Sequence, residues 1–199
     1  MQHEAGVSVI KKNGNLLITG NCWYEIIGLK SLLSARYREI TCIQLKSLNG
    51  QDSFEHAIIA LSDEPLVTWW GNLPYIFELR KRISGSMIVL VPKTLNKIKV
   101  LNGICQICDG QGELHKLHDE IIKLTAERQL STSFRLTKGQ VELLKSVSSN
   151  TLNIKKNRRW FYYHCSKLAK NVGILKHPKL MMIGLNRGCD YFGENVNEK

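Results

Sequence analysis

Residues 56–91 read HAIIALSDEPLVTWWGNLPYIFELRKRISGSMIVLV, and this stretch decides the fold. It begins and ends with short apolar runs, HAIIAL at residues 56–61 and SMIVLV at residues 86–91. Such near-uniform apolarity predicts strands that are covered on both faces. Residues 73–83 between them have helical character, and a helix joining two buried strands predicts parallel pairing through a right-handed crossover.

The same alternation extends outward on both sides of this stretch. Further strands are expected at residues 15–19, 40–45 and 104–108. Further helices are expected at residues 22–37, 93–101 and 113–128. The pattern predicts an α/β domain over residues 14–128 with a flavodoxin-like parallel sheet.

The remaining residues predict a second, small all-α domain. Residues 129–135 are polar and are expected to form a linker, residues 136–184 the domain, and residues 185–199 a flexible tail. Thr137 is suited to cap a first helix, and a basic helix follows a polar break and runs through Lys170. A short helix, a turn and a basic helix together are typical of a helix-turn-helix.

The charge is concentrated in this second part of the chain. The 199 residues include 28 Lys and Arg against 17 Asp and Glu, and residues 131–199 hold 13 of the former and 4 of the latter. Nucleic acid is the commonest partner of such a segment, although charge alone does not separate it from acidic lipid or protein. No run approaches the roughly 20 apolar residues of a membrane helix, and no secretory signal is found. We therefore expect a soluble, cytoplasmic protein that does not bind membranes.

A set of residues in this part resembles the LuxR-type helix-turn-helix. The matching positions are Leu136, Thr137, Val141, Leu143, Leu144, Phe161, His164, Leu168, Gly173 and Ile174. The resemblance implies a transcription regulator that binds double-stranded DNA as a dimer. The chain is shorter than the family pattern around residues 151–155, where the bracing helix is expected. That loss favours an alternative, a modulator that pairs with a full-length LuxR-type regulator and has little specific DNA binding of its own.

The basic helix supplies the candidate DNA-binding residues. Side chains expected to read bases are Arg158, Arg159, Tyr162, Tyr163 and Ser166, because Arg can bind guanine and Tyr can pack on thymine methyl groups. Side chains expected to contact phosphate are Lys155, Lys156, Lys167 and Lys170. Trp160, Phe161 and His164 are expected to pack in the core. The alternative for the whole set is a solvated basic helix.

The first domain resembles the receiver domain of two-component response regulators, without its acidic residues. The resemblance implies an acidic pair after the first strand, an Asp after the third and a Lys after the fifth. Here the first strand is followed by Asn21 and Cys22, the third offers only Asp63, and Cys108 stands at the fifth. We expect no metal site and no phosphorylation by the usual chemistry. Enterobacterial regulators of capsule, curli and fimbriae resemble this arrangement, which implies fimbrial or other surface-structure genes as targets.

Three other features have residue types found in functional sites. Cys105 and Cys108 with His115 and His118 have the ligand types of zinc, but the odd spacing in a strand points the two thiols to opposite faces. Trp69-Trp70 fits a small core or an exposed partner surface equally well. No nucleophile set, carboxylate pair or complete phosphate loop is found, so we expect neither an enzyme nor a cofactor.

Overall fold

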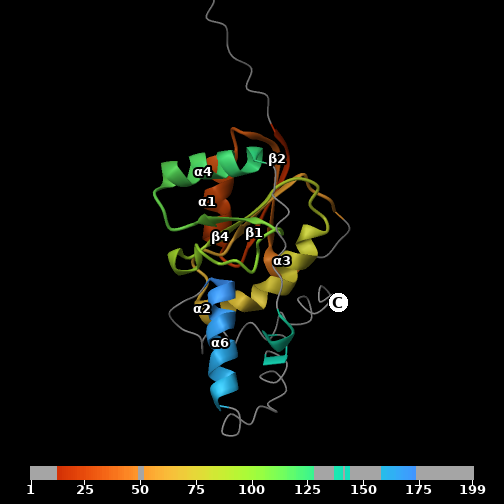
Figure 1. The fold of residues 1–199 in the computed structure, drawn as a ribbon. Coiled ribbons are helices and arrows are strands. Elements are labelled where there is room, and N and C mark those ends of the chain that lie inside the picture. The colour runs from red at the N-terminus through yellow and green to blue at the C-terminus, as the bar shows by residue number, and fades with distance from the viewer. Residues whose placement is uncertain (1–12, 49–51, 128–136, 141, 144–157, 174–199) are drawn as a thin grey trace, which may run out of the picture.

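The α/β part of the chain is built on a five-stranded parallel sheet (Figure 1). The computed structural model describes residues 13–48, 52–127, 137–140, 142–143 and 158–173. The strands are β1 (Asn13–Gly20), β2 (Tyr37–Gln44), β3 (His56–Ala60), β4 (Met87–Val91) and β5 (Gln106–Asp109), in the order β2-β1-β3-β4-β5. This order confirms the predicted flavodoxin-like sheet.

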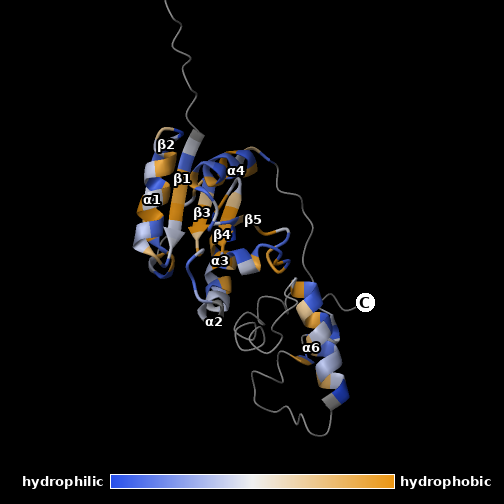
Figure 2. Ribbon diagram, turned by 90° about the vertical axis from the view of Figure 1, so that its left-hand side faces the viewer, coloured by the Kyte–Doolittle hydropathy of each residue, from blue (hydrophilic) through white to orange (hydrophobic). Residues whose placement is uncertain are grey.

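Helices cover both faces of the sheet and create two apolar cores. The helices are α1 (Trp23–Leu33), α2 (Leu66–Trp69), α3 (Leu73–Arg80), α4 (Leu114–Ala126) and α6 (Arg158–Val172), with 3-10 turns η1 (Leu45–Ser47), η2 (Trp70–Asn72) and η3 (Lys93–Leu95). Successive residues of β1 point to opposite faces, so Leu16 and Ile18 join the core under α1 and α4. Leu17 joins the core under α2 and α3. Figure 2 shows the resulting apolar strands between helices of mixed hydropathy.

The tryptophan pair belongs to the core. Trp69 and Trp70 are 0% and 2% exposed, and their rings meet edge to face with centroids 5.2 Å apart. The pair lies where α2 passes into η2, a helical segment that the sequence pattern did not predict. The alternative of an exposed partner surface at these two residues is therefore wrong.

The predicted helix at residues 93–101 is wrong, and a tertiary contact explains why. Only η3 forms there, followed by turns. In an α-helix the Lys99 N–H would donate to the Leu95 carbonyl. That carbonyl accepts from Ile98 instead, and the Lys99 N–H donates to the carbonyl of Val172 in α6 at 2.8 Å.

The other predicted elements are found with shifted ends. The helix expected at residues 22–37 stops at Leu33, because Tyr37 is buried and begins β2. The strand expected at residues 104–108 is found as β5, which begins two residues later and ends one residue later. The proposed linker at residues 129–135, the turn of the helix-turn-helix and the tail at residues 185–199 lie outside the described residues. Of the described helices, none is long and apolar enough to cross a membrane.

Candidate nucleic-acid interface

Helix α6 has one buried face and one exposed face. The buried side chains are Phe161, Cys165, Leu168, Ala169 and Val172, which recur at helical spacing. They join the core on the α2 and α3 side of the sheet. The predicted inner positions Phe161, Leu168 and Val172 are confirmed.

The exposed face carries most of the predicted DNA-binding residues. We call it the outer surface of α6, and it consists of Arg159, Tyr162, Tyr163, Ser166, Lys167 and Lys170. Tyr162 and Tyr163 are half exposed, at 50% and 53%. The Lys167 ammonium lies 4.7 Å from the centroid of the Tyr163 ring, so a cation–π contact holds both side chains on this surface.

Three predicted residues cannot be placed on this surface. Arg158 is the first residue of α6, but its side chain lies outside the described part of the chain. Lys155 and Lys156 also lie outside the described residues. Their roles stay predictions.

A short helical segment after Thr137 packs beside α6. The Thr137 N–H donates to the side-chain oxygen of Gln140 at 2.9 Å, which is half of a capping box. The same oxygen accepts a hydrogen bond from the Asn171 amide of α6 at 3.3 Å. The expected helix start at Thr137 is thus confirmed, and Gln140 links the two helices.

Three aromatic side chains of α6 are packing residues, as predicted: Trp160, Phe161 and His164. The His164 ring lies 4.6 Å from Trp160 and 5.2 Å from Tyr163 between ring centroids. Its Nδ1 is buried and has no hydrogen-bond partner among the described residues, so the expected packing is confirmed. Phe161 is buried and Trp160 partly buried against the core, so neither is available as a wedge between bases.

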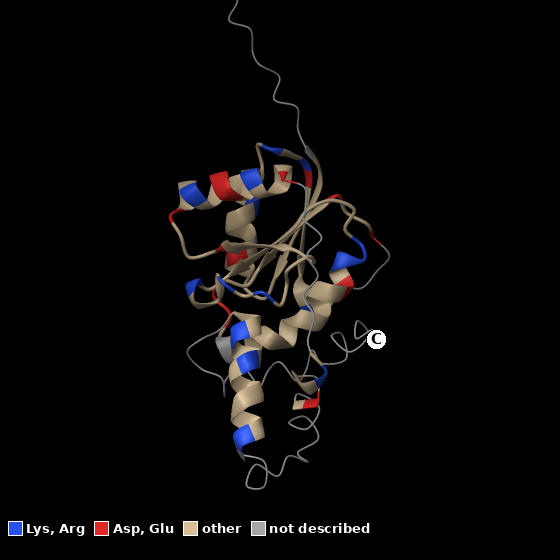
Figure 3. Ribbon diagram, viewed as in Figure 1, with Lys and Arg blue, Asp and Glu red and all other residues tan. Residues whose placement is uncertain are grey.

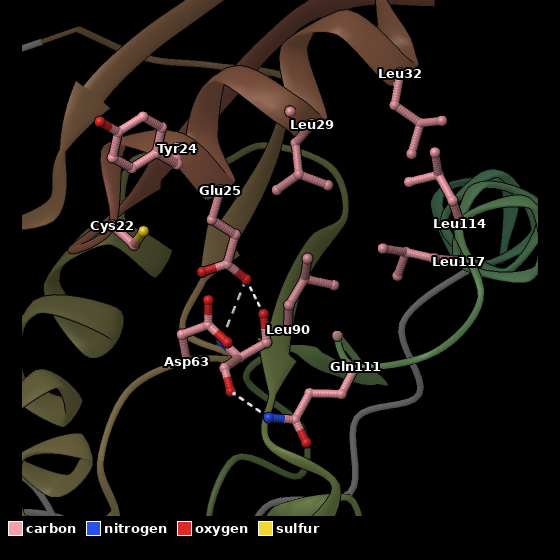
Figure 4. A pocket seen from close by; sticks show the side chains of 13 residues that line it. Cys22, Tyr24, Glu25, Leu29, Leu32, Asp63, Leu90, Gln111, Leu114 and Leu117 are labelled. Atoms are coloured by element: carbon pink, nitrogen blue, oxygen red, sulfur yellow. Dashed lines mark hydrogen bonds between the residues drawn. The ribbon is translucent and has the colours of Figure 1, made fainter.

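The carboxyl ends of β1 and β3 form a second polar region, held together by hydrogen bonds between side chains. The Asn21 amide donates to Glu64 at 2.9 Å and to the Asn72 side-chain oxygen at 3.1 Å. Glu25 accepts from the backbone N–H of Ser62 at 3.3 Å and also from its hydroxyl group (Figure 4). These bonds fasten the loops that follow the two strands.

Glu25 lines a pocket of about 270 Å³ between α1 and α4. Burial raises the pKa of Glu25 to about 7, the nearby Asp63 and Glu64 charges add to the rise, and the Ser62 backbone hydrogen bond opposes it. Asp63 itself is exposed. Glu25 is a site residue that was not predicted from the sequence, although its position in the first turn of a helix after β1 places it at this edge of the sheet.

The residues at this edge do not fit the magnesium site of a receiver domain. Leu61 and Cys108 are buried at the ends of β3 and β5, and burial raises the pKa of the Cys108 thiol. Glu25 and Glu64 already accept hydrogen bonds from Ser62 and Asn21. In the described part of the chain, no group of three His, Cys, Asp or Glu could hold a metal ion.

The two cysteines considered for zinc point away from each other, as predicted. Cys105 lies in the core under α2 and α3, and Cys108 lies in the core under α1 and α4. His115 is exposed beside Glu113, and His118 contacts Asp119. These four side chains cannot converge on one ion, because the sheet separates the thiols.

The chain has only weak similarity to known proteins. No known family and no curated protein matches the chain. Among solved structures the chain is similar to the RcsB response regulator of Salmonella typhimurium, described for its conformational dynamism in DNA interaction. The identity is 15%, the TM-score is 0.37, and the match covers 92% of this chain and 100% of that one. A TM-score this low transfers no function.

Proposed function

We propose that this protein is a transcription regulator that binds double-stranded DNA through the outer surface of α6. The observation that supports this proposal best is the composition of that surface. It presents Arg, Lys and Tyr side chains, and α6 contains no Asp or Glu that would repel phosphate. We also propose that the protein is not an enzyme and uses no cofactor.

The side chains divide into two roles. Arg159, Tyr162, Tyr163 and Ser166 contact base edges in the major groove, with Arg158 beside them in the proposed complex. Lys167 and Lys170 contact phosphates, as do Lys155 and Lys156, and they supply affinity that depends on salt. Binding to a two-fold operator requires a dimer. The proposed targets are fimbrial or other surface-structure genes, because of the resemblance described above, and the proposed location is the cytoplasm.

The proposed regulator is not switched by phosphorylation of an aspartate. The residue types at the edge support this, since Asn21 and Cys22 follow β1 and Cys108 lies in β5, where the resemblance implies carboxylates and a lysine. We expect Asp63→Asn to leave DNA binding unchanged, because this side chain is exposed and is not part of α6. A gel-shift titration with wild-type and variant protein measures this.

The Arg159→Ala variant tests the assignment of α6. Loss of a bidentate arginine–guanine contact costs about 1–3 kcal/mol, so the affinity for promoter DNA should fall roughly 5- to 150-fold. Arg38→Ala, at an exposed position on the edge strand β2, is the matched control and should bind like wild type. An Arg159→Ala protein with wild-type affinity would contradict the proposed role of α6.

A second candidate function is supported by an exposed apolar patch. Trp23, Tyr24 and Ile27 of α1 are 47%, 90% and 42% exposed, and Leu114 of α4 is exposed nearby. Tyr24 and Leu114 line the same pocket, so the two helices expose apolar side chains in the same area. Such an area fits a modulator that pairs with a full-length LuxR-type regulator.

The modulator function predicts that pairing depends on this patch. Mixing with a full-length regulator should give a heterodimer by light scattering, and Trp23→Ser with Tyr24→Ser should abolish it. Under this second function, Arg159→Ala would leave the heterodimer intact. A wild-type protein that forms no heterodimer but binds its promoter alone would contradict it.

A further inference from the structure

The C-terminal turn of α6 is fastened to the α/β domain through backbone groups. The Val172 carbonyl, at the end of α6, accepts a hydrogen bond from the Lys99 N–H at 2.8 Å. Gly173 follows with φ +88°, and a Cβ at this position would collide with the carbonyl oxygen of Lys97. Val172 and Ile98 belong to the same apolar core. The segment at residues 93–103 therefore lies directly beside the end of α6.

This segment is basic, and its charges continue those of α6. It contains Lys93, Lys97 and Lys99 and no Asp or Glu. Lys97 and Lys99 are exposed, and no ion pair involves either side chain within the described part of the chain. In Figure 3 basic residues lie at both ends of α6 and on the adjoining segment after β4. Neither segment contributes an acidic residue to this part of the molecule.

The length of α6 places this junction near the DNA backbone. From Arg159 to Val172 the helix rises about 20 Å, at about 1.5 Å per residue. The major groove is only about 12 Å wide. If the N-terminal half of α6 lies in the groove and the helix runs across it, the last turn reaches the phosphates at the edge of the groove. Figure 1 shows α6 extending away from the sheet, which leaves its N-terminal end clear of the α/β domain.

We propose that Lys97 and Lys99 of the α/β domain contact DNA phosphates beside the bases that α6 reads. The inference rests on the proposed function and adds a second source of phosphate contacts, outside the helix-turn-helix. Because phosphate contacts do not distinguish sequences, these lysines raise affinity and fix the orientation of α6 without changing base preference.

The double variant Lys97→Gln/Lys99→Gln tests this contact. Each phosphate contact contributes about −0.9 to the slope of log affinity against log salt concentration. The double variant should therefore have a slope that is less steep by about 1.8. The preference for promoter over scrambled DNA should stay as in wild type. The matched control is Lys116→Gln/Lys123→Gln on α4, which removes the same charge on the opposite side of the sheet and should leave the slope unchanged.

The outcomes separate this inference from the function on which it rests. If wild-type protein does not bind DNA, the proposed function fails and the inference with it. If wild type binds and the double variant keeps the wild-type salt slope, only the inference fails. A double variant that loses thermal stability while keeping the slope would assign these lysines to stabilising the C-terminus of α6 and would also overturn the inference.

Discussion

Glu25 is a carboxyl group whose titration in the folded protein differs from that in the unfolded chain. Burial raises its pKa from 4.5 to about 7, with Asp63 and Glu64 adding to the rise. Between these two pH values the unfolded chain releases a proton that the folded protein retains. The free energy of unfolding contributed by this group therefore falls as the pH rises from about 4.5 to 7, and it is constant above that range.

The Glu25→Gln variant removes this dependence. The amide oxygen of the substituted side chain is still able to accept from Ser62, and the amide has no charge to bury. The variant should therefore be more stable than wild type at pH 7.5 and similar to it at pH 4.5. We expect a difference of about 1–2 kcal/mol at the higher pH after allowance for solvent screening. Urea denaturation at the two pH values measures it.

The comparison with wild type is needed because His56 titrates in the same range. Burial lowers the pKa of His56, so its contribution to stability rises with pH, with the opposite sign to that of Glu25. His56 is present in both proteins, and the difference between them isolates Glu25. Equal stabilities at pH 7.5 would show that Glu25 is not desolvated in the folded protein.

At the level of elements, two glycines should respond in opposite ways to alanine. Gly173 adopts φ +88° and faces the Lys97 carbonyl, so Gly173→Ala combines backbone strain with a collision. We expect a loss of about 1–3 kcal/mol. Gly28 lies in α1, exposed, with nothing within 4 Å of an added Cβ, so Gly28→Ala should stabilise the protein by about 0.5–1 kcal/mol.

Thermal unfolding monitored by circular dichroism compares the two glycine variants. A Gly173→Ala protein as stable as wild type would show that the end of α6 is not held against residues 93–103. Gly28→Ala is the control. It shows whether the measurement detects a change in stability of the expected size at a position where an added Cβ meets no other atoms.

The elements that the sequence predicted well are those whose pattern follows from burial alone. The strands β3 and β4 could be predicted from their apolar runs, and α4 from its apolar stripe, because both patterns depend only on which side chains are buried away from water. Residues 93–101 also include apolar residues, and a helix was predicted there. The helix does not form because the Lys99 N–H donates to the Val172 carbonyl of α6, and a local sequence pattern cannot predict a partner so distant in the chain. The same is true of Glu25, which meets Ser62 only because the start of α1 and the end of β3 lie at the same edge of the sheet.

The part of the candidate site that lies on α6 could be predicted from the sequence. The spacing of Phe161, Leu168 and Val172 fixed the buried face, and the exposed positions of α6 followed from it. Lys97 and Lys99 could not be predicted as site residues, because they lie near α6 only through the packing of residues 93–103 against the end of that helix.

At the scale of the whole molecule, the apolar packing of α6 and the net charge of the chain both bear on how the protein binds DNA. Side chains of α6 belong to the same apolar cluster as those of α2 and α3, and the α/β domain holds the C-terminal end of the helix through the Lys99–Val172 hydrogen bond. On the other side it presents a surface without acidic residues, in a chain with a net charge of +11. Non-specific binding to DNA at low salt is therefore expected in any case, and only sequence preference distinguishes a regulator from a basic protein.

The measurement that tests the central claim most directly compares promoter DNA with scrambled DNA of the same length. Binding of the wild-type protein is titrated at salt concentrations from about 50 to 300 mM, the range in which phosphate-dominated affinity falls steeply. We predict that affinity for both DNAs falls with salt and that a preference for the promoter persists at the upper end. Equal affinity for both DNAs across the whole range would contradict the claim that α6 reads sequence.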